Sequence, residues 1–145
     1  MRGSFDDEHV KKLLAHALTS ESNPGVRLKS LNIIKANQLK LADKDMKAAL
    51  IKVLKSDDNA GVRRVAMEAL EQLPYDSDIR ESFLYTLTND NNPGLRISAI
   101  DNLVTKAAGQ LMDQEILKTL REKMQADNNI YIRVRAQNLL EDIKQ

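Results

Sequence analysis

The 145-residue chain has no cysteine and no tryptophan, and its aromatic residues are limited to two Phe and three Tyr. The absence of cysteine excludes a disulfide framework, a thiolate metal site and a cysteine nucleophile. A core must therefore be built from Leu, Ile, Val, Ala and Met. Hydrophobic residues still make up 42% of the chain, which is enough for one ordinary domain with a shared core.

Neither an excess of one charge nor a long apolar run is present. The 22 Lys and Arg residues nearly balance the 21 Asp and Glu residues, so the formal net charge is +1. A strong generic attraction to nucleic acid or to anionic lipid is therefore not indicated. No apolar run approaches the roughly 18 residues of a membrane span, and no signal-peptide core is visible. We expect a soluble protein, cytoplasmic if the chain is complete.

One short phrase occurs four times, at residues 21–27, 57–63, 90–96 and 127–133. Each copy runs from a turn through a short polar segment to an arginine, and the arginines recur every 33 to 37 residues. Self-similarity at a period of roughly 20–50 residues is typical of solenoids and other repeat arrays. Stacked repeats form extended surfaces more readily than catalytic pockets.

The phrase contains a helix start. An asparagine stands four residues before each arginine, and asparagine is among the best N-cap residues. In two copies proline follows, at the first helical position, where its missing N–H is not needed. The four predicted caps are Asn23, Asn59, Asn92 and Asn129.

Apolar residues on both sides of the caps predict two amphipathic helices in each repeat, helix A before the phrase and helix B from the cap onward. In the first copy, helix B carries Val26, Ser30 and Ile34 at i, i+4 and i+8, and helix A carries Leu14 and Leu18 at i and i+4. The later copies repeat this pattern. Starts for the later helices A are indicated by Asp43, by Asp76 or Ser77, and by Asp113.

These signals predict an all-α fold without strands, a right-handed α-solenoid of four helix-turn-helix repeats and about eight helices in a single domain over residues 1–145. Helices are expected at 6–19, 24–36, 43–55, 60–72, 77–89, 93–106, 113–125 and 130–143, in repeats at about 5–37, 42–73, 76–107 and 112–144. Irregular segments are expected at Asn37–Ala42 and Ala107–Met112. Ser4 either belongs to a vector-derived leader or caps the first helix together with Asp7.

The pattern resembles the HEAT repeat, in four copies over nearly the whole chain. It consists of an acidic turn residue, a Val-Arg pair that opens helix B, then a small residue and Leu. The resemblance implies a ladder in which turn acids and arginines pair between neighbouring repeats. The matching residues are Glu21, Asp57, Asp90 and Asp127 with Arg27, Arg63, Arg96 and Arg133. The fourth copy departs by having Ile130-Tyr131 where Pro-Gly or Ala-Gly stands elsewhere. A weaker resemblance is to HEAT segments of bacterial anti-sigma-like regulators, whose zinc finger and membrane segment are not found in this sequence.

The arginine row and the two histidines could each form a ligand site or have a structural role. The arginine row suits phosphate geometry, but each arginine arrives with a turn acid, which favours the ladder. His9 and His16 lie two turns apart, about 10 Å along a helix, which is too far to share one metal ion. We expect no metal, no cofactor and no other small ligand.

Enzymes of HEAT-like fold need residues that this chain does not have. Deoxyhypusine hydroxylase uses His-Glu dipeptides as iron ligands, and the sequence contains none. The alkylpurine DNA glycosylases use a basic channel lined by aromatics that include Trp. Bilin lyase subunits share the architecture, but no residue set distinguishes them here. No serine-triad pattern or glycine-rich phosphate loop is present either, so we expect no catalytic activity.

Binding is expected instead on helix B, which normally lines the concave side of such a solenoid. Its exposed positions form polar rows across the repeats, with acidic residues in the centre and Val104 and Glu141 at the far end of the second row. One interpretation is a mildly acidic groove for a basic or polar segment of a protein partner, and the other is a solvated helix face. The candidate partner-binding residues are Asn32, Lys35, Glu68, Glu71, Asp101 and Asn138.

The function predicted from the sequence is thus a non-enzymatic protein-interaction or scaffold module. One alternative is a DNA-binding or DNA-repair domain of the glycosylase type, against which the near-neutral charge and the few aromatics argue. Another is a structural or regulatory segment of a larger bacterial regulator.

Overall fold

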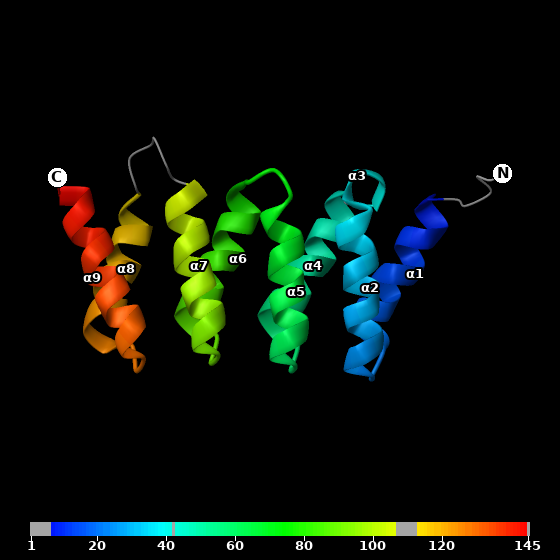
Figure 1. The fold of residues 1–145 in the computed structure, drawn as a ribbon. Coiled ribbons are helices and arrows are strands. Elements are labelled where there is room, and N and C mark those ends of the chain that lie inside the picture. The colour runs from blue at the N-terminus through cyan, green and yellow to red at the C-terminus, as the bar shows by residue number, and fades with distance from the viewer. Residues whose placement is uncertain (1–6, 42, 107–112, 145) are drawn as a thin grey trace. The chain divides into compact units, whose positions relative to one another are not determined.

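The structure is a computed structural model that describes residues 7–41, 43–106 and 113–144 (Figure 1). These residues form nine α-helices and no strand, so the all-α helical-repeat solenoid is confirmed. The possible Ser4 cap and the predicted irregular segment Ala107–Met112 lie outside the described residues. The helices are α1 (Asp7–Ser20), α2 (Pro24–Ala36), α3 (Gln38–Leu41), α4 (Lys44–Ser56), α5 (Ala60–Glu71), α6 (Ser77–Asn89), α7 (Pro93–Lys106), α8 (Gln114–Ala126) and α9 (Ile130–Lys144).

The repeated asparagines begin α2, α5, α7 and α9, which are the helices B. Asn59 Oδ1 accepts a hydrogen bond from the Val62 amide at 3.0 Å, and Asn92 and Asn129 accept in the same way from the amides three residues ahead, at 3.1 Å. Asn23 accepts from the Gly25 amide at 2.8 Å. The four caps are therefore confirmed. The fourth copy keeps this turn despite its Ile-Tyr sequence.

Aspartates begin three of the helices A. Asp43, Asp76 and Asp113 each accept from the amide three residues ahead, at 2.9 Å. This geometry decides between the two starts proposed for α6, because the capping side chain is that of Asp76. All eight predicted helices end within one residue of their predicted positions.

The prediction of an irregular Asn37–Ala42 is wrong, because Gln38–Leu41 forms the short helix α3. Asn37 ends α2 with non-helical dihedrals, and its carbonyl accepts from the Lys40 amide at 3.0 Å, which starts a new turn. The segment contains no Gly or Pro, so nothing in its sequence opposes helix formation.

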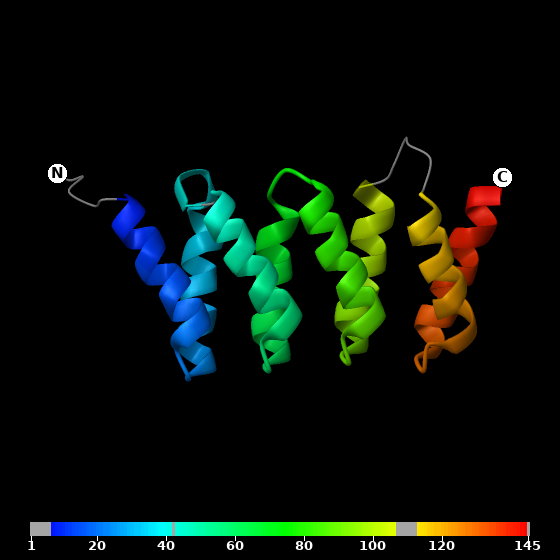
Figure 2. The same ribbon diagram turned by 180° about the vertical axis from the view of Figure 1, so that it is seen from behind.

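The chain forms two compact units, Met1–Ile79 and Arg80–Gln145. In the first, α1 pairs with α2 and α4 with α5, while α2 packs on α5 and α1 on α4 (Figures 1 and 2). In the second, α6 lies beside α7, α8 pairs with α9, and α9 packs on α7. The single domain over residues 1–145 stays a prediction.

The predicted apolar columns fill the core of both units. Leu50, Val62 and Leu70 are fully buried in the first unit, as are Phe83 and Ile132 in the second. The first copy differs at one position, because Val26 is 40% exposed whereas its counterpart Val62 is 0% exposed. The expectation that Val26 is a core residue is wrong. Val62 lies on α5, which packs against both α4 and α2, whereas α2 packs against α1, α3 and α5.

Candidate interaction surface

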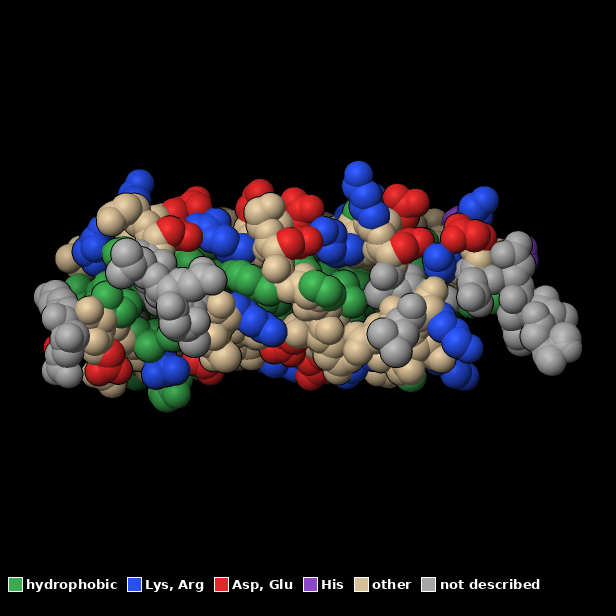
Figure 3. All heavy atoms as spheres, turned by 90° about the horizontal axis from the view of Figure 1, so that it is seen from above, with side chains coloured by type: hydrophobic (Ala, Val, Ile, Leu, Met, Phe, Trp, Pro, Cys, Tyr) green, Lys and Arg blue, Asp and Glu red, His purple; other side chains and the backbone are tan. Residues whose placement is uncertain are grey.

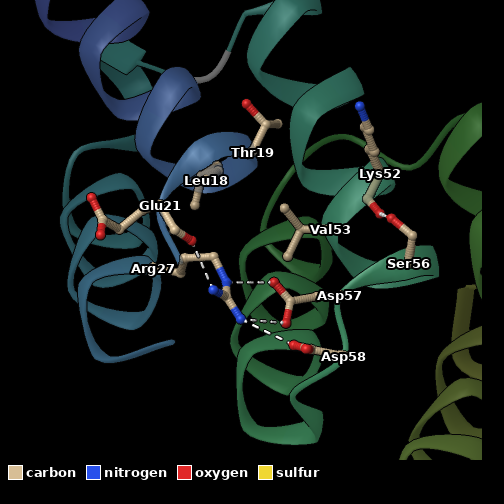
Figure 4. A pocket seen from close by; sticks show the side chains of 9 residues that line it. All are labelled: Leu18, Thr19, Glu21, Arg27, Lys52, Val53, Ser56, Asp57 and Asp58. Atoms are coloured by element: carbon tan, nitrogen blue, oxygen red, sulfur yellow. Dashed lines mark hydrogen bonds and ion pairs between the residues drawn. The ribbon is translucent and has the colours of Figure 1, made fainter. Parts of the chain in front are cut away.

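Arg27 joins the first two repeats at the turn between helices A and B (Figure 4). Its Nη1 donates to the carbonyl of Glu21 at 2.8 Å, within its own repeat. Its Nε and Nη2 donate to the two carboxylate oxygens of Asp57 at 2.7 and 3.0 Å, and Nη2 also reaches Asp58 at 3.2 Å. The hydrogen bond to Asp57 raises the pKa of Arg27.

The second unit repeats this geometry around Arg96. Its Nη1 donates to the Asp90 carbonyl at 2.8 Å, while Nε and Nη2 reach the Asp127 carboxylate at 3.1 and 3.0 Å. Burial alone would raise the pKa of Asp127, but hydrogen bonds from Arg96 and from the Asn129 amide hold it below the ordinary aspartate value. For Arg27 and Arg96, the acid six residues before the arginine thus offers its carbonyl, and the carboxylate comes from the next repeat.

Shallow clefts lie beside these pairs. One of about 290 Å³ is lined by Leu18, Arg27, Lys52 and Asp57 among others, and a second of about 300 Å³ is lined by Arg96, Lys123 and Asp127 among others. Most N–H groups of both arginines already donate to carbonyl or carboxylate oxygens. The arginines are therefore engaged in joining repeats and are not presented to a phosphate.

A second set of ion pairs lies at the other end of the helices A, and sequence reasoning missed it. Lys11 Nζ contacts Asp43 at 3.0 Å, Lys47 contacts Asp76 at 2.5 Å, and Arg80 contacts Asp113 at 2.7 Å. Figure 3 views this end of the molecule, where acidic and basic side chains stand next to each other. The signal was available, because a basic residue stands four positions after each of Asp7, Asp43 and Asp76 and pairs with the next aspartate cap.

These pairs also set the ionisation of the caps. The Lys47 ammonium, followed by the Ile79 amide, lowers the pKa of Asp76. The Met46 amide, with the Lys11 ammonium, lowers the pKa of Asp43 despite the opposing effect of burial. Each aspartate therefore caps its own helix as a carboxylate and holds the preceding repeat by charge.

The predicted binding row of the first unit lies on α2 and α5. Asn32 is exposed, and Lys35 Nζ lies 2.9 Å from the Glu68 carboxylate of the next repeat. The Glu68 side chain remains 40% exposed in this pair. Glu71 is half-buried on the same helix as Glu68. The structure therefore brings Lys35 and Glu68 together as a surface ion pair.

In the second unit the row lies on α7 and α9. Asp101 Oδ1 accepts from Arg135 Nε and Nη2 at 3.2 and 3.0 Å, and its side chain is 47% exposed. Asn138 is exposed, and Glu141 accepts from Gln137 at 3.3 Å. Val104, on α7, is half-buried. Arg135 was not among the predicted residues, and it neutralises the central acid of this unit.

No metal-binding arrangement is found in the part of the chain that the structure describes, since no three His, Cys, Asp or Glu side chains are suitably placed. His9 and His16 are exposed on α1, and His16 Nδ1 lies 3.4 Å from the Ser20 hydroxyl. Within residues 7–41, 43–106 and 113–144, no helix has the length and apolar character that a membrane span requires.

Comparison with known protein families matches residues 48–141, more than half of the chain, to HEAT repeats. The chain belongs to the HEAT-repeat family. Neither a curated protein nor a solved structure matches it. The match begins within α4, yet the hairpin of α1 and α2 also has an asparagine cap, at Asn23, and the same ion pair to the next repeat, at Arg27, so the HEAT pattern extends to the first repeat. The resemblance to bacterial regulators stays a prediction.

Proposed function

We propose that this HEAT-repeat protein is a non-enzymatic module that binds a protein partner along the exposed polar positions of its helices B. HEAT repeats generally act as protein-interaction scaffolds and typically do not catalyse reactions. The candidate contact residues are Asn32, Lys35, Glu68, Glu71, Asp101 and Asn138.

The proposal rests on the exposure and the ion pairs of two carboxylates, those of Glu68 and Asp101. Glu68 and Asp101 keep 40% and 47% of their side chains exposed, and each is paired with a cation on a neighbouring helix B. Such surface pairs contribute only about 0–1 kcal/mol, so they exchange partners at little cost. An arginine from a partner can take over either carboxylate through two parallel hydrogen bonds. The proposed partner segment is therefore polar and basic.

The test is a pull-down with mass spectrometry, using the wild type and the double reversal Glu68→Lys/Asp101→Lys. The matched control is Asp45→Lys/Glu122→Lys, which makes the same charge change at exposed positions of the helices A. We expect the partner to be lost with the first variant and kept with the control, with helix content unchanged in both. A partner that both variants retain equally would show that the proposed row is wrong.

A parallel measurement with labelled duplex DNA addresses the nucleic-acid alternative. The near-neutral charge and the ion-paired helix-B row lead us to expect no binding at physiological salt. Salt-sensitive DNA binding that the helix-B reversal strengthens would favour the alternative.

A further inference from the structure

The outer side of the first repeat is apolar. Leu13 on α1 and Val26 and Ile33 on α2 are 58%, 40% and 42% exposed. In the second repeat the counterparts of the two α2 residues are Val62 and Ala69, which are buried on α5, the helix that packs against α2. Val26 and Ile33 therefore occupy positions that form contacts between repeats, and Leu13 is an exposed apolar residue of α1, which pairs with α2. With Glu21 they define what we call the N-face.

Glu21 adds an acidic group to this face. Its counterparts Asp57 and Asp127 each receive the arginine of the preceding repeat. Glu21 offers only its carbonyl, to Arg27, and its side chain is exposed (Figure 4). In that view the carboxylate of Glu21 points away from the guanidinium. The N-face thus presents a carboxylate at the position where Asp57 and Asp127 receive the arginine of the preceding repeat.

The outer side of the fourth repeat carries an arginine and apolar residues that complement the N-face. Arg133 Nη1 donates to the Asp127 carbonyl at 2.7 Å, as Arg27 and Arg96 do with their own turn carbonyls. Among the described residues, nothing accepts from its Nε and Nη2. Ile130 and Val134, neighbours of Arg133 on α9, are 67% and 48% exposed. These three residues define the C-face.

We propose that the C-face of one copy of this chain binds the N-face of a second copy, head to tail. Arg133 donates hydrogen bonds from Nε and Nη2 to the Glu21 carboxylate of the other copy, as Arg27 does to Asp57 within the chain. Ile130 and Val134 then pack against the apolar residues of the N-face. The contact continues the interface that already joins the repeats.

Charge selects this arrangement over a symmetric one. Two N-faces placed together bring two Glu21 carboxylates without a cation from Arg133, and two C-faces bring two arginines without a carboxylate. The head-to-tail contact is heterologous, so it leaves one N-face and one C-face exposed and permits further addition.

Two substitutions make the contact weaker than the interfaces within the chain. Gln137 is exposed where the first and third repeats have the buried Leu31 and Ile100. Leu117 stands where Lys11 and Arg80 pair with the next aspartate cap. The association therefore lacks one apolar contact and one of the two ion pairs. We expect a weak, reversible complex whose population rises with concentration.

The experiment is sedimentation velocity over protein concentrations from about 10 µM to about 1 mM, the range in which weak complexes form. Val26→Glu blocks the N-face and Val134→Glu blocks the C-face. Both positions are exposed, so we expect both variants to fold. We expect the wild type to associate and each variant alone to stay monomeric. An equimolar mixture should form a dimer and stop there, because one functional face of each kind remains.

Several outcomes overturn the proposal. They are a wild type that stays monomeric throughout, a Val134→Glu variant that still dimerises through its N-face, and a mixture that forms no dimer. A second experiment exchanges the charges of Glu21 and Arg133. Glu21→Arg and Arg133→Glu should each weaken association at least tenfold, and the double variant should restore it. The control Asp45→Arg should leave association unchanged. The helix-B reversal Glu68→Lys/Asp101→Lys should also leave it unchanged, which separates this proposal from the proposed function.

Discussion

Replacing Asp127 with alanine removes a buried carboxylate of the second unit. Its side chain is 2% exposed and accepts from Arg96, from the Asn129 amide and from Lys123. The Arg96 side chain, 6% exposed, loses its charged partner in the variant. It keeps the Asp90 carbonyl and the Asn128 amide oxygen. The substitution therefore leaves a buried guanidinium with neutral acceptors only.

The expected loss follows from this geometry. Breaking a buried ion pair by removing one partner costs about 3–5 kcal/mol. The remaining acceptors of Arg96 place the expected value for Asp127→Ala at the lower end, about 3 kcal/mol. Asp127→Asn keeps an acceptor for the Asn129 amide and should lose about half as much, about 1.5 kcal/mol. The control Asp101→Ala removes the half-exposed pair with Arg135 and should lose less than about 1 kcal/mol.

The assay is urea denaturation followed by far-ultraviolet circular dichroism, with the free energy of unfolding taken from the transition that each variant shifts. A repeat array need not unfold in one step, so variants are compared within the same transition. The double variant Arg96→Met/Asp127→Leu should regain much of the lost stability, since it removes the unpaired charge. If Asp127→Ala loses no more free energy than Asp101→Ala, the pairing of Arg96 with Asp127 is not what stabilises this unit.

Three further predictions concern the caps and the ion pairs. Folding lowers the pKa values of three aspartates, Asp43, Asp76 and Asp127. These carboxylates therefore stabilise the folded protein fully above the pKa of an aspartate in the unfolded chain, about 3.9. The stabilisation is lost as the pH falls through their pKa values in the folded protein. Acid titration by circular dichroism should therefore show stability falling below about pH 4 and less steeply in Asp127→Asn; an equal slope would contradict this. Asn59→Ala removes the side-chain oxygen that accepts from the Val62 amide, and the free energy of unfolding in urea should fall by about 1 kcal/mol. In the control Asn32→Ala, which replaces an asparagine that caps no helix, it should change by less than about 0.5 kcal/mol. Arg80→Met removes the partly exposed contact with Asp113 and should lose under about 1 kcal/mol, mostly at low ionic strength; a loss that is unchanged in high salt would refute an electrostatic cause.

Much of the fold followed from local chemistry that a sequence displays. The asparagine caps, the proline at the first helical position and the apolar columns act within one turn or one helix, so eight helices could be placed to within one residue. The short helix α3 could not be predicted, because four residues carry too little periodicity.

The candidate binding row shows where sequence reasoning ends. The sequence placed Glu68 and Asp101 on exposed positions of helix B, and a carboxylate on such a position suggests an acidic groove. Their partners Lys35 and Arg135 stand more than thirty residues away and were not linked to them by any local pattern. Only packing of one repeat on the next brings these charges within hydrogen-bonding distance.

The sequence by itself determined the repeat, its register and the start of nearly every helix, because capping and amphipathic periodicity depend on neighbours along the chain. The tertiary structure decided which atoms each repeated group uses. It directs the turn carbonyl to the arginine of the same repeat and the turn carboxylate to the arginine before it, for Asp127 as for Asp57. It also decided that Val26, a core residue by pattern, is exposed. Burial depends on what packs against a face, and that is set by stacking across repeats.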